Sequence, residues 1–110
     1  MISFPGVPGL RPTPDRVRET LFNWLGQTLY GRTCLDLFAG SGVLGFEAAS
    51  RGAERVVMVE KNPAAVRALQ DNIKKLGCAN IFVRAQDGLE FASRDVQRYD
   101  VIFLDPPFQS

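Results

Sequence analysis

The sequence contains two motifs whose residue types and spacing suit ligand chemistry. The first, at residues 40–45, reads Gly-Ser-Gly-Val-Leu-Gly and matches the pattern G-x-G-x-x-G. Its glycines permit a tight turn and let a ligand come close to the backbone and to the N-terminus of a following helix. The pattern is a weak signal on its own, because a plain strand-to-helix turn also uses glycine.

The second motif, Asp105-Pro106-Pro107-Phe108, offers acceptors that suit an amine. Its two prolines fix the backbone, so that the Asp105 carboxylate and the Pro106 carbonyl oxygen can converge on one small group. The exocyclic amine of a nucleobase has two N–H donors to match, and Phe108 supplies a flat face for stacking the base. The competing interpretation is a proline-rich turn with no function.

Acidic residues near these motifs narrow the choice of ligand. Glu60 can accept both hydroxyls of an adenosine ribose and would repel a ribose 2′-phosphate, which leaves NAD or S-adenosylmethionine. Asp36, just before the glycines, would repel a pyrophosphate but could bind the ammonium group of S-adenosylmethionine. The alternative interpretation of Asp36 is a structural hydrogen bond to a backbone amide. Asp87 offers a carboxylate for the adenine amino group, and a simple turn is its alternative.

The elements predicted around these residues bring them to one edge of a sheet. Short apolar runs predict strands at residues 34–38, 55–60, 81–83 and 101–104, and helices are predicted at 43–51, 63–76 and 88–94. For the helix at 63–76, Asn62 and Pro63 are typical of the start and Gly77 of the end, and the predicted apolar face is Ala65, Val66, Leu69, Ile73 and Leu76. This alternation predicts an α/β fold with a parallel sheet covered on both faces. With right-handed crossovers the sheet is Rossmann-like, and its ligands bind beyond the carboxyl ends of the strands.

The N-terminal part of the chain has a different pattern. Three prolines and two glycines in residues 1–12 predict an irregular lead-in. Thr13, Pro14 and Asp15 are typical of a helix start, which predicts a helix over 13–31 that ends at Gly31. The chain is therefore expected to be one domain, residues 1–110, with the α/β core at 33–110.

Composition excludes several classes of protein. With 110 residues, 45% of them hydrophobic, the chain fits one globular domain. It has no histidine, which excludes Ser-His-Asp and Cys-His mechanisms and a His-ligated zinc site, and no metal is predicted. Two cysteines fit a reducing cytoplasm, and no apolar run is long enough to span a bilayer. The net charge of +1 permits contact with a polyanion without requiring it.

Together, these motifs resemble the S-adenosylmethionine-dependent amino-methyltransferases. The stretch at residues 11–25, RPTPDRVRETLFNWL, narrows the resemblance to the bacterial 16S rRNA guanine-N2 methyltransferase family (RsmD-like). The resemblance implies S-adenosyl-L-methionine as cofactor, 16S rRNA or the small ribosomal subunit as substrate, and the N2 amine of a guanine as methyl acceptor.

The resemblance also implies two sets of site residues. The cofactor-binding set is Asp36, Phe38, Ala39, Gly40, Ser41, Gly42, Glu60, Lys61, Asn62, Asp87 and Gly88. The set that holds the acceptor amine is Asp105, Pro106, Pro107 and Phe108.

Members of this family have a seven-stranded sheet, whereas only four strands are predicted here. The chain is therefore expected to be the cofactor-binding portion of the enzyme, with most of the acceptor-binding half absent. The strand at 101–104 would then be an exposed edge through which the chain self-associates. Three alternatives stay open: a DNA adenine-N6 or cytosine-N4 methyltransferase, an NAD-binding oxidoreductase domain, and a non-catalytic nucleotide-binding module.

Overall fold

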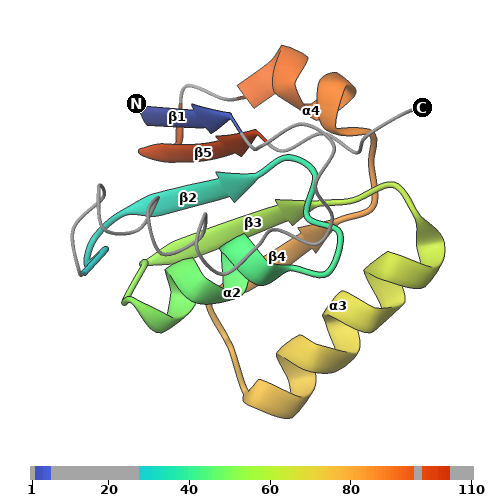
Figure 1. The fold of residues 1–110 in the computed structure, drawn as a ribbon, viewed down its shortest axis with the longest axis horizontal. Helices are drawn as coiled ribbons and strands as arrows, with labels where there is room; N and C mark the ends of the chain where they lie inside the picture. Colours follow the sequence, from blue (N-terminus) through green and yellow to red (C-terminus); the bar gives the residue numbers. More distant parts are fainter. Residues whose placement is uncertain (1, 6–27, 96–97, 105–110) are drawn as a thin grey trace.

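A five-stranded parallel sheet is the centre of the fold in the computed structural model, which describes residues 2–5, 28–95 and 98–104 (Figure 1). The strands lie side by side in the order β1-β5-β2-β3-β4. They are β1 (Ile2–Pro5), β2 (Thr33–Asp36), β3 (Arg55–Val59), β4 (Ile81–Arg84) and β5 (Val101–Leu104). The helices are α2 (Val43–Ser50), α3 (Pro63–Leu76) and α4 (Gly88–Asp95). The predicted α/β fold class is confirmed, and all four predicted strands are present.

The additional strand, β1, corrects two predictions. Residues 2–5 pair in parallel with β5, although an irregular segment was predicted there. Pro5 is compatible with this pairing because it is the last residue of an edge strand, where a missing N–H is tolerated. Since β5 pairs with β1 on one side and β2 on the other, it is an inner strand. The prediction that residues 101–104 form an exposed edge for self-association is therefore wrong.

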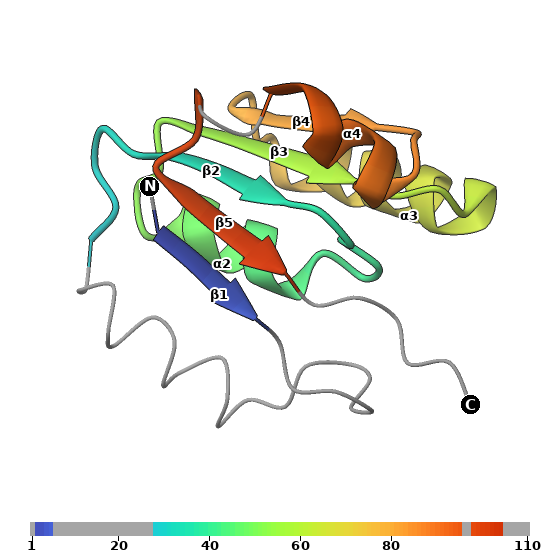
Figure 2. The ribbon, with the colours of Figure 1, turned by 90° about the horizontal axis from the view of Figure 1, so that it is seen from above.

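The helices α2 and α3 cover one face of the sheet (Figure 2). Leu44 of α2 and Leu69 of α3 belong to the same buried cluster as Val56, Met58 and Phe103 of the strands. Because these strand residues are fully buried, this face supplies the larger part of the core and holds α2 firmly behind the glycine motif.

The opposite face is covered by α4 and is smaller. Val57 and Ile102 are buried there, and Phe91 of α4 packs against their cluster. At the edge strand β4 this cover ends, so that Phe82 is 40% exposed, with the Arg55 guanidinium 5.3 Å from the centre of its ring. The prediction of a sheet covered on both faces is confirmed, with the cover ending at the edge strand β4.

The ends of α3 follow their sequence signals. Asn62 Oδ1 accepts a hydrogen bond from the Ala65 N–H at 3.0 Å, Pro63 is the first helical residue, and Gly77 ends the helix with φ of 67°. The apolar face predicted for α3 is less accurate. Leu76, predicted to be a core residue, is 65% exposed in the last turn, where it lines an open groove between α2 and α3.

The predicted N-terminal helix, residues 13–31, lies mostly outside the described residues. Residues 28–30 are described and are not helical. The Leu29 N–H donates to the Arg51 carbonyl oxygen at 2.7 Å, and Tyr30 forms an antiparallel bridge with Ala53. The prediction that this helix continues to Gly31 is therefore wrong, because these residues pair with the turn before β3 instead. Among the helices that the structure describes, none is long and apolar enough to cross a membrane.

Candidate functional site

The glycine motif forms the turn between β2 and α2, next to the buried carboxyl group of Asp36. Asp36 is the last residue of β2 and is only 1% exposed. Gly40 and Gly42 have φ angles of 55° and 86°, which other residues rarely adopt. The turn is fixed to the sheet because the Ala39 N–H donates to the Val59 carbonyl oxygen at 3.0 Å.

Two glycines of this motif also allow close packing. A Cβ atom at Gly42 would lie 2.6 Å from side-chain atoms of both Leu69 and Phe46. A Cβ atom at Gly45 would overlap the side chain of Met58. Gly42 therefore lets α3 pack closely against the start of α2, and Gly45 lets α2 lie close to β3. This leaves Ser41, which is exposed, at the outer surface of the turn.

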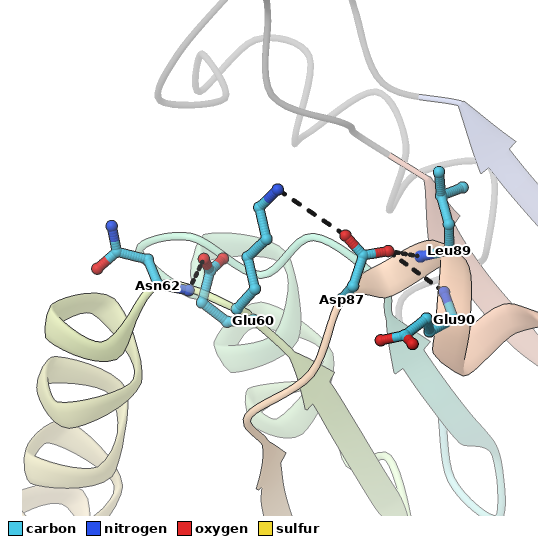
Figure 3. A network of polar contacts seen from close by, with 6 residues as sticks. Glu60, Asn62, Asp87, Leu89 and Glu90 are labelled. Carbon is cyan, nitrogen blue, oxygen red and sulfur yellow. Dashed lines mark hydrogen bonds and ion pairs between the residues drawn. The ribbon is translucent and has the colours of Figure 1, made fainter.

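Glu60 is hydrogen-bonded both to the glycine turn and to the start of α3, and Figure 3 shows its bond to the start of α3. Its Oε1 accepts a hydrogen bond from the Gly40 N–H at 2.8 Å, and its Oε2 accepts one from the Asn62 N–H at 3.0 Å. Each carboxylate oxygen has a second lone pair, so the group can still accept hydroxyl donors. Glu60 is thus held in place by two segments while it remains able to bind a ligand.

Asp87 occupies the equivalent position at the end of β4. Its Oδ1 accepts from the N–H groups of Leu89 at 2.9 Å and Glu90 at 3.2 Å, which caps α4. Its Oδ2 lies 3.8 Å from Lys61 Nζ. The simple turn that was the alternative for this residue is present, but its carboxylate also faces the end of β3.

Gly88, predicted to bind cofactor, has a packing role that explains its residue type. It is buried, and a Cβ atom there would overlap the carbonyl oxygen of Leu37 and lie 2.8 Å from the ring of Phe38. Phe38 is half-buried at this contact. Gly88 therefore lets the start of α4 lie against the turn that follows β2, which draws the ends of β2 and β4 together.

The three carboxylates lie at the carboxyl ends of three neighbouring parallel strands: Asp36 ends β2, Glu60 directly follows β3, and Asp87 comes three residues after the end of β4. The site that they form is rich in hydrogen-bond acceptors, and Lys61 is the cation paired there. Such a set fits the hydroxyl and amino groups of an adenosine without phosphates and would repel a pyrophosphate. This chemistry favours S-adenosylmethionine over NAD, as the sequence also predicts.

The predicted acceptor residues Asp105, Pro106, Pro107 and Phe108 lie outside the described residues. The last described residue before them is Leu104, which ends β5 beside β2. Their roles remain predictions from the sequence.

The two cysteines are free, and Cys34 is not a nucleophile. Burial and the nearby Asp100 carboxylate raise the pKa of Cys34 to about 12, against a smaller opposite effect of Arg32. The thiol is therefore protonated at neutral pH and serves as a small core side chain. Among the residues that the structure describes, no group of three His, Cys, Asp or Glu side chains is placed to hold a metal ion.

Comparison with curated proteins gives matches over nearly the whole chain. Residues 1–110 match the family model described as Conserved hypothetical protein 95. The chain is 44% identical over 105 residues to Ribosomal RNA small subunit methyltransferase D of Escherichia coli strain K12. This match covers 96% of the chain and 53% of that protein, so the chain spans about half the length of the curated relatives it matches.

Solved structures have the same fold. An Escherichia coli protein, yhhF, described as a candidate methyltransferase, superposes with a TM-score of 0.80 at 37% identity, over 94% of this chain and 58% of that one. An RNA methyltransferase from Salinibacter ruber, solved with S-adenosyl-L-homocysteine, has a TM-score of 0.72 at 26% identity, over 84% of this chain and 59% of that one.

Proposed function

Since this chain belongs to the Conserved hypothetical protein 95 family, we propose that it is the cofactor-binding part of an S-adenosylmethionine-dependent methyltransferase that modifies 16S ribosomal RNA. The proposed acceptor is the exocyclic N2 amine of a guanine. An enzyme with this substrate works in the cytoplasm, in agreement with the two free cysteines.

The observation that carries the proposal is the position of Glu60. Its carboxylate is held by the N–H groups of Gly40 and Asn62, and it stands between the buried Asp36 and the half-exposed Asp87. An adenosine bound along this row would place its ribose hydroxyls on Glu60, its adenine amino group on Asp87 and its amino-acid end at the glycine turn near Asp36. The relative solved with S-adenosyl-L-homocysteine supports the same choice of ligand.

Each group in the site has a separate role in the proposed mechanism. S-Adenosylmethionine, when bound, supplies a methyl group on a sulfonium. Asp36 and the turn at residues 38–42 would bind and orient the amino-acid end of that ligand, and Glu60 with Asn62 would hold the ribose side. Asp105 and the Pro106 carbonyl oxygen would accept the two hydrogens of the guanine amine and aim its lone pair, while Phe108 stacks on the base. The main contribution of the protein is therefore positioning.

The binding half of the proposal can be tested on the 110-residue chain itself. We expect calorimetry to show binding of S-adenosylhomocysteine and no binding of NADH. Binding of NADH alone would identify an oxidoreductase domain, and binding of neither ligand would refute the proposed cofactor site.

The substrate half needs a chain with the full length of the relatives. We expect such a chain to transfer labelled methyl groups to under-methylated small ribosomal subunits and not to duplex DNA. Transfer to DNA adenine or cytosine would instead establish a DNA amino-methyltransferase, because an acidic residue followed by two prolines suits amines of either nucleic acid.

A further inference from the structure

The two oxygens of Asp87 have different partners in the described structure. Oδ1 accepts two backbone N–H groups, those of Leu89 and Glu90, which fixes the side chain at the start of α4. Oδ2 lies 3.8 Å from Lys61 Nζ, which is longer than the roughly 3.2 Å limit of an ordinary N–H···O hydrogen bond. Oδ1 is therefore used to cap α4, whereas Oδ2 faces the ammonium group of Lys61, which can move.

The ion pair between Lys61 and Asp87 is formed at the surface. The side chain of Lys61 is 64% exposed and that of Asp87 is 36% exposed. Exposed pairs of this kind contribute little to stability, open readily and weaken as salt is added. The ammonium group of Lys61 can thus leave Asp87 and return to it at little cost in free energy.

The pair also spans the place where an adenine ring would lie. Lys61 directly follows Glu60 at the end of β3, and Asp87 follows the neighbouring strand β4. A ligand with its ribose at Glu60 and its base at Asp87 must cross the gap between these strand ends (Figure 3). There, the ammonium of Lys61 and the amino group of adenine would both donate to the same oxygen.

We propose that Lys61 competes with the adenine amino group for Asp87 Oδ2, and so lowers the affinity of the site for its cofactor. This inference rests on the proposed function. The ligand binds when the ammonium swings away into solvent, and the cost of separating it from Asp87 is subtracted from the binding free energy. Lys61 therefore acts on cofactor affinity through Asp87, and salt relieves its effect.

The experiment measures S-adenosylhomocysteine binding by calorimetry at about 20 mM and about 500 mM salt, where screening differs strongly. For the natural chain we expect affinity to rise about two- to fourfold with salt, the scale of a surface ion pair. Lys61→Met is expected to bind about two- to fivefold more tightly at low salt and to lose the salt dependence. Lys61→Arg keeps the charge and is expected to behave like the natural chain.

The matched control is Lys74→Met, which removes the same charge from an exposed lysine in the last turn of α3, at the opposite end of the strands. It is expected to leave both the affinity and its salt dependence unchanged. The unfolding midpoint of unliganded Lys61→Met, measured in parallel, is expected to equal that of the natural chain.

The inference is overturned if Lys61→Met binds as Lys74→Met does, or binds more weakly than the natural chain at low salt. If neither the natural chain nor any variant binds S-adenosylhomocysteine, the proposed function itself fails. These outcomes are distinct, because the first requires measurable binding and the second requires its absence.

Discussion

The two oxygens of the Glu60 carboxylate accept N–H groups from two segments, the glycine turn at Gly40 and the start of α3 at Asn62. A glutamine has one oxygen and one NH2 group, so it can accept from one segment and must oppose the N–H of the other. We therefore expect Glu60→Gln to weaken S-adenosylhomocysteine binding nearly as much as Glu60→Ala, by about 1–3 kcal/mol. Calorimetry checks this, with Glu90→Gln as a control at an exposed position. An unchanged dissociation constant for Glu60→Gln would show that the two hydrogen bonds of Glu60 do not matter for ligand binding.

Asp105 allows a second test at this scale, in a chain with the length of the curated relatives. Asp105 is proposed to contact the acceptor amine and not the adenosine. Asp105→Ala is therefore expected to abolish methyl transfer to ribosomal subunits while leaving S-adenosylhomocysteine affinity nearly unchanged, whereas Glu60→Ala should lower both. Near-normal turnover by Asp105→Ala would show that the acceptor site is assigned wrongly.

The placement of Asp36, Glu60 and Asp87 at one edge of the sheet was predictable, whereas their contacts were not. Parallel strands bring their carboxyl ends to one edge, and the role of these three acids in cofactor binding stays a prediction. The bond from Gly40 to Glu60 and the pair of Lys61 with Asp87 join residues about 20 or more positions apart. No local pattern specifies such contacts. The bonds of Asp87 to the start of α4 are local and have the spacing of an N-cap, but they were not predicted.

At the scale of the helices, two glycines with positive φ allow the cost of backbone strain to be compared with the cost of overpacking. Gly42 at the start of α2 and Gly77 at the end of α3 both have left-handed backbones, but only Gly42 has no room for a Cβ atom. Gly77→Ala should lower the free energy of unfolding by about 1–2 kcal/mol through backbone strain alone. Gly42→Ala should add an overpacking cost of about 1–3 kcal/mol against Leu69 and Phe46. Urea unfolding measures both, and equal losses would contradict the close packing described at α2.

Elements with local signals were predicted well, and elements defined by distant partners were not. The caps of α3 depend on neighbours in sequence, namely Asn62, Pro63 and Gly77, and all three are confirmed. β1 contains Pro5 and was predicted to be irregular, because its only strand partner, β5, lies near the other end of the chain. Leu76 fits the apolar period of α3, yet it lies where the helix is no longer covered.

At the scale of the whole molecule, we expect the 110-residue chain to keep cofactor binding without methyl transfer. The described ends of β2, β3 and β4 are proposed to supply the adenosine contacts, whereas the curated relatives are nearly twice as long as this chain. With a net charge of +1, the chain has little electrostatic attraction for a large RNA. We expect the 110-residue chain to bind S-adenosylhomocysteine and to transfer no labelled methyl to under-methylated ribosomal subunits. A transfer rate like that of a full-length relative would contradict this.

The pairing of β1 with β5 has a consequence for the order in which the sheet assembles. Ile2 aligns with Val101, so these two strands close a loop that contains nearly the entire chain. During synthesis β1 leaves the ribosome before β5 and must wait until β5 has emerged before it can pair. Such a long closure carries a high entropic cost and forms late, whereas β2, β3 and β4 join through short helical crossovers. The amide hydrogens between β1 and β5 should accordingly exchange with solvent before those between β2 and β3, so that β1 would separate from the sheet while its inner strands stay paired.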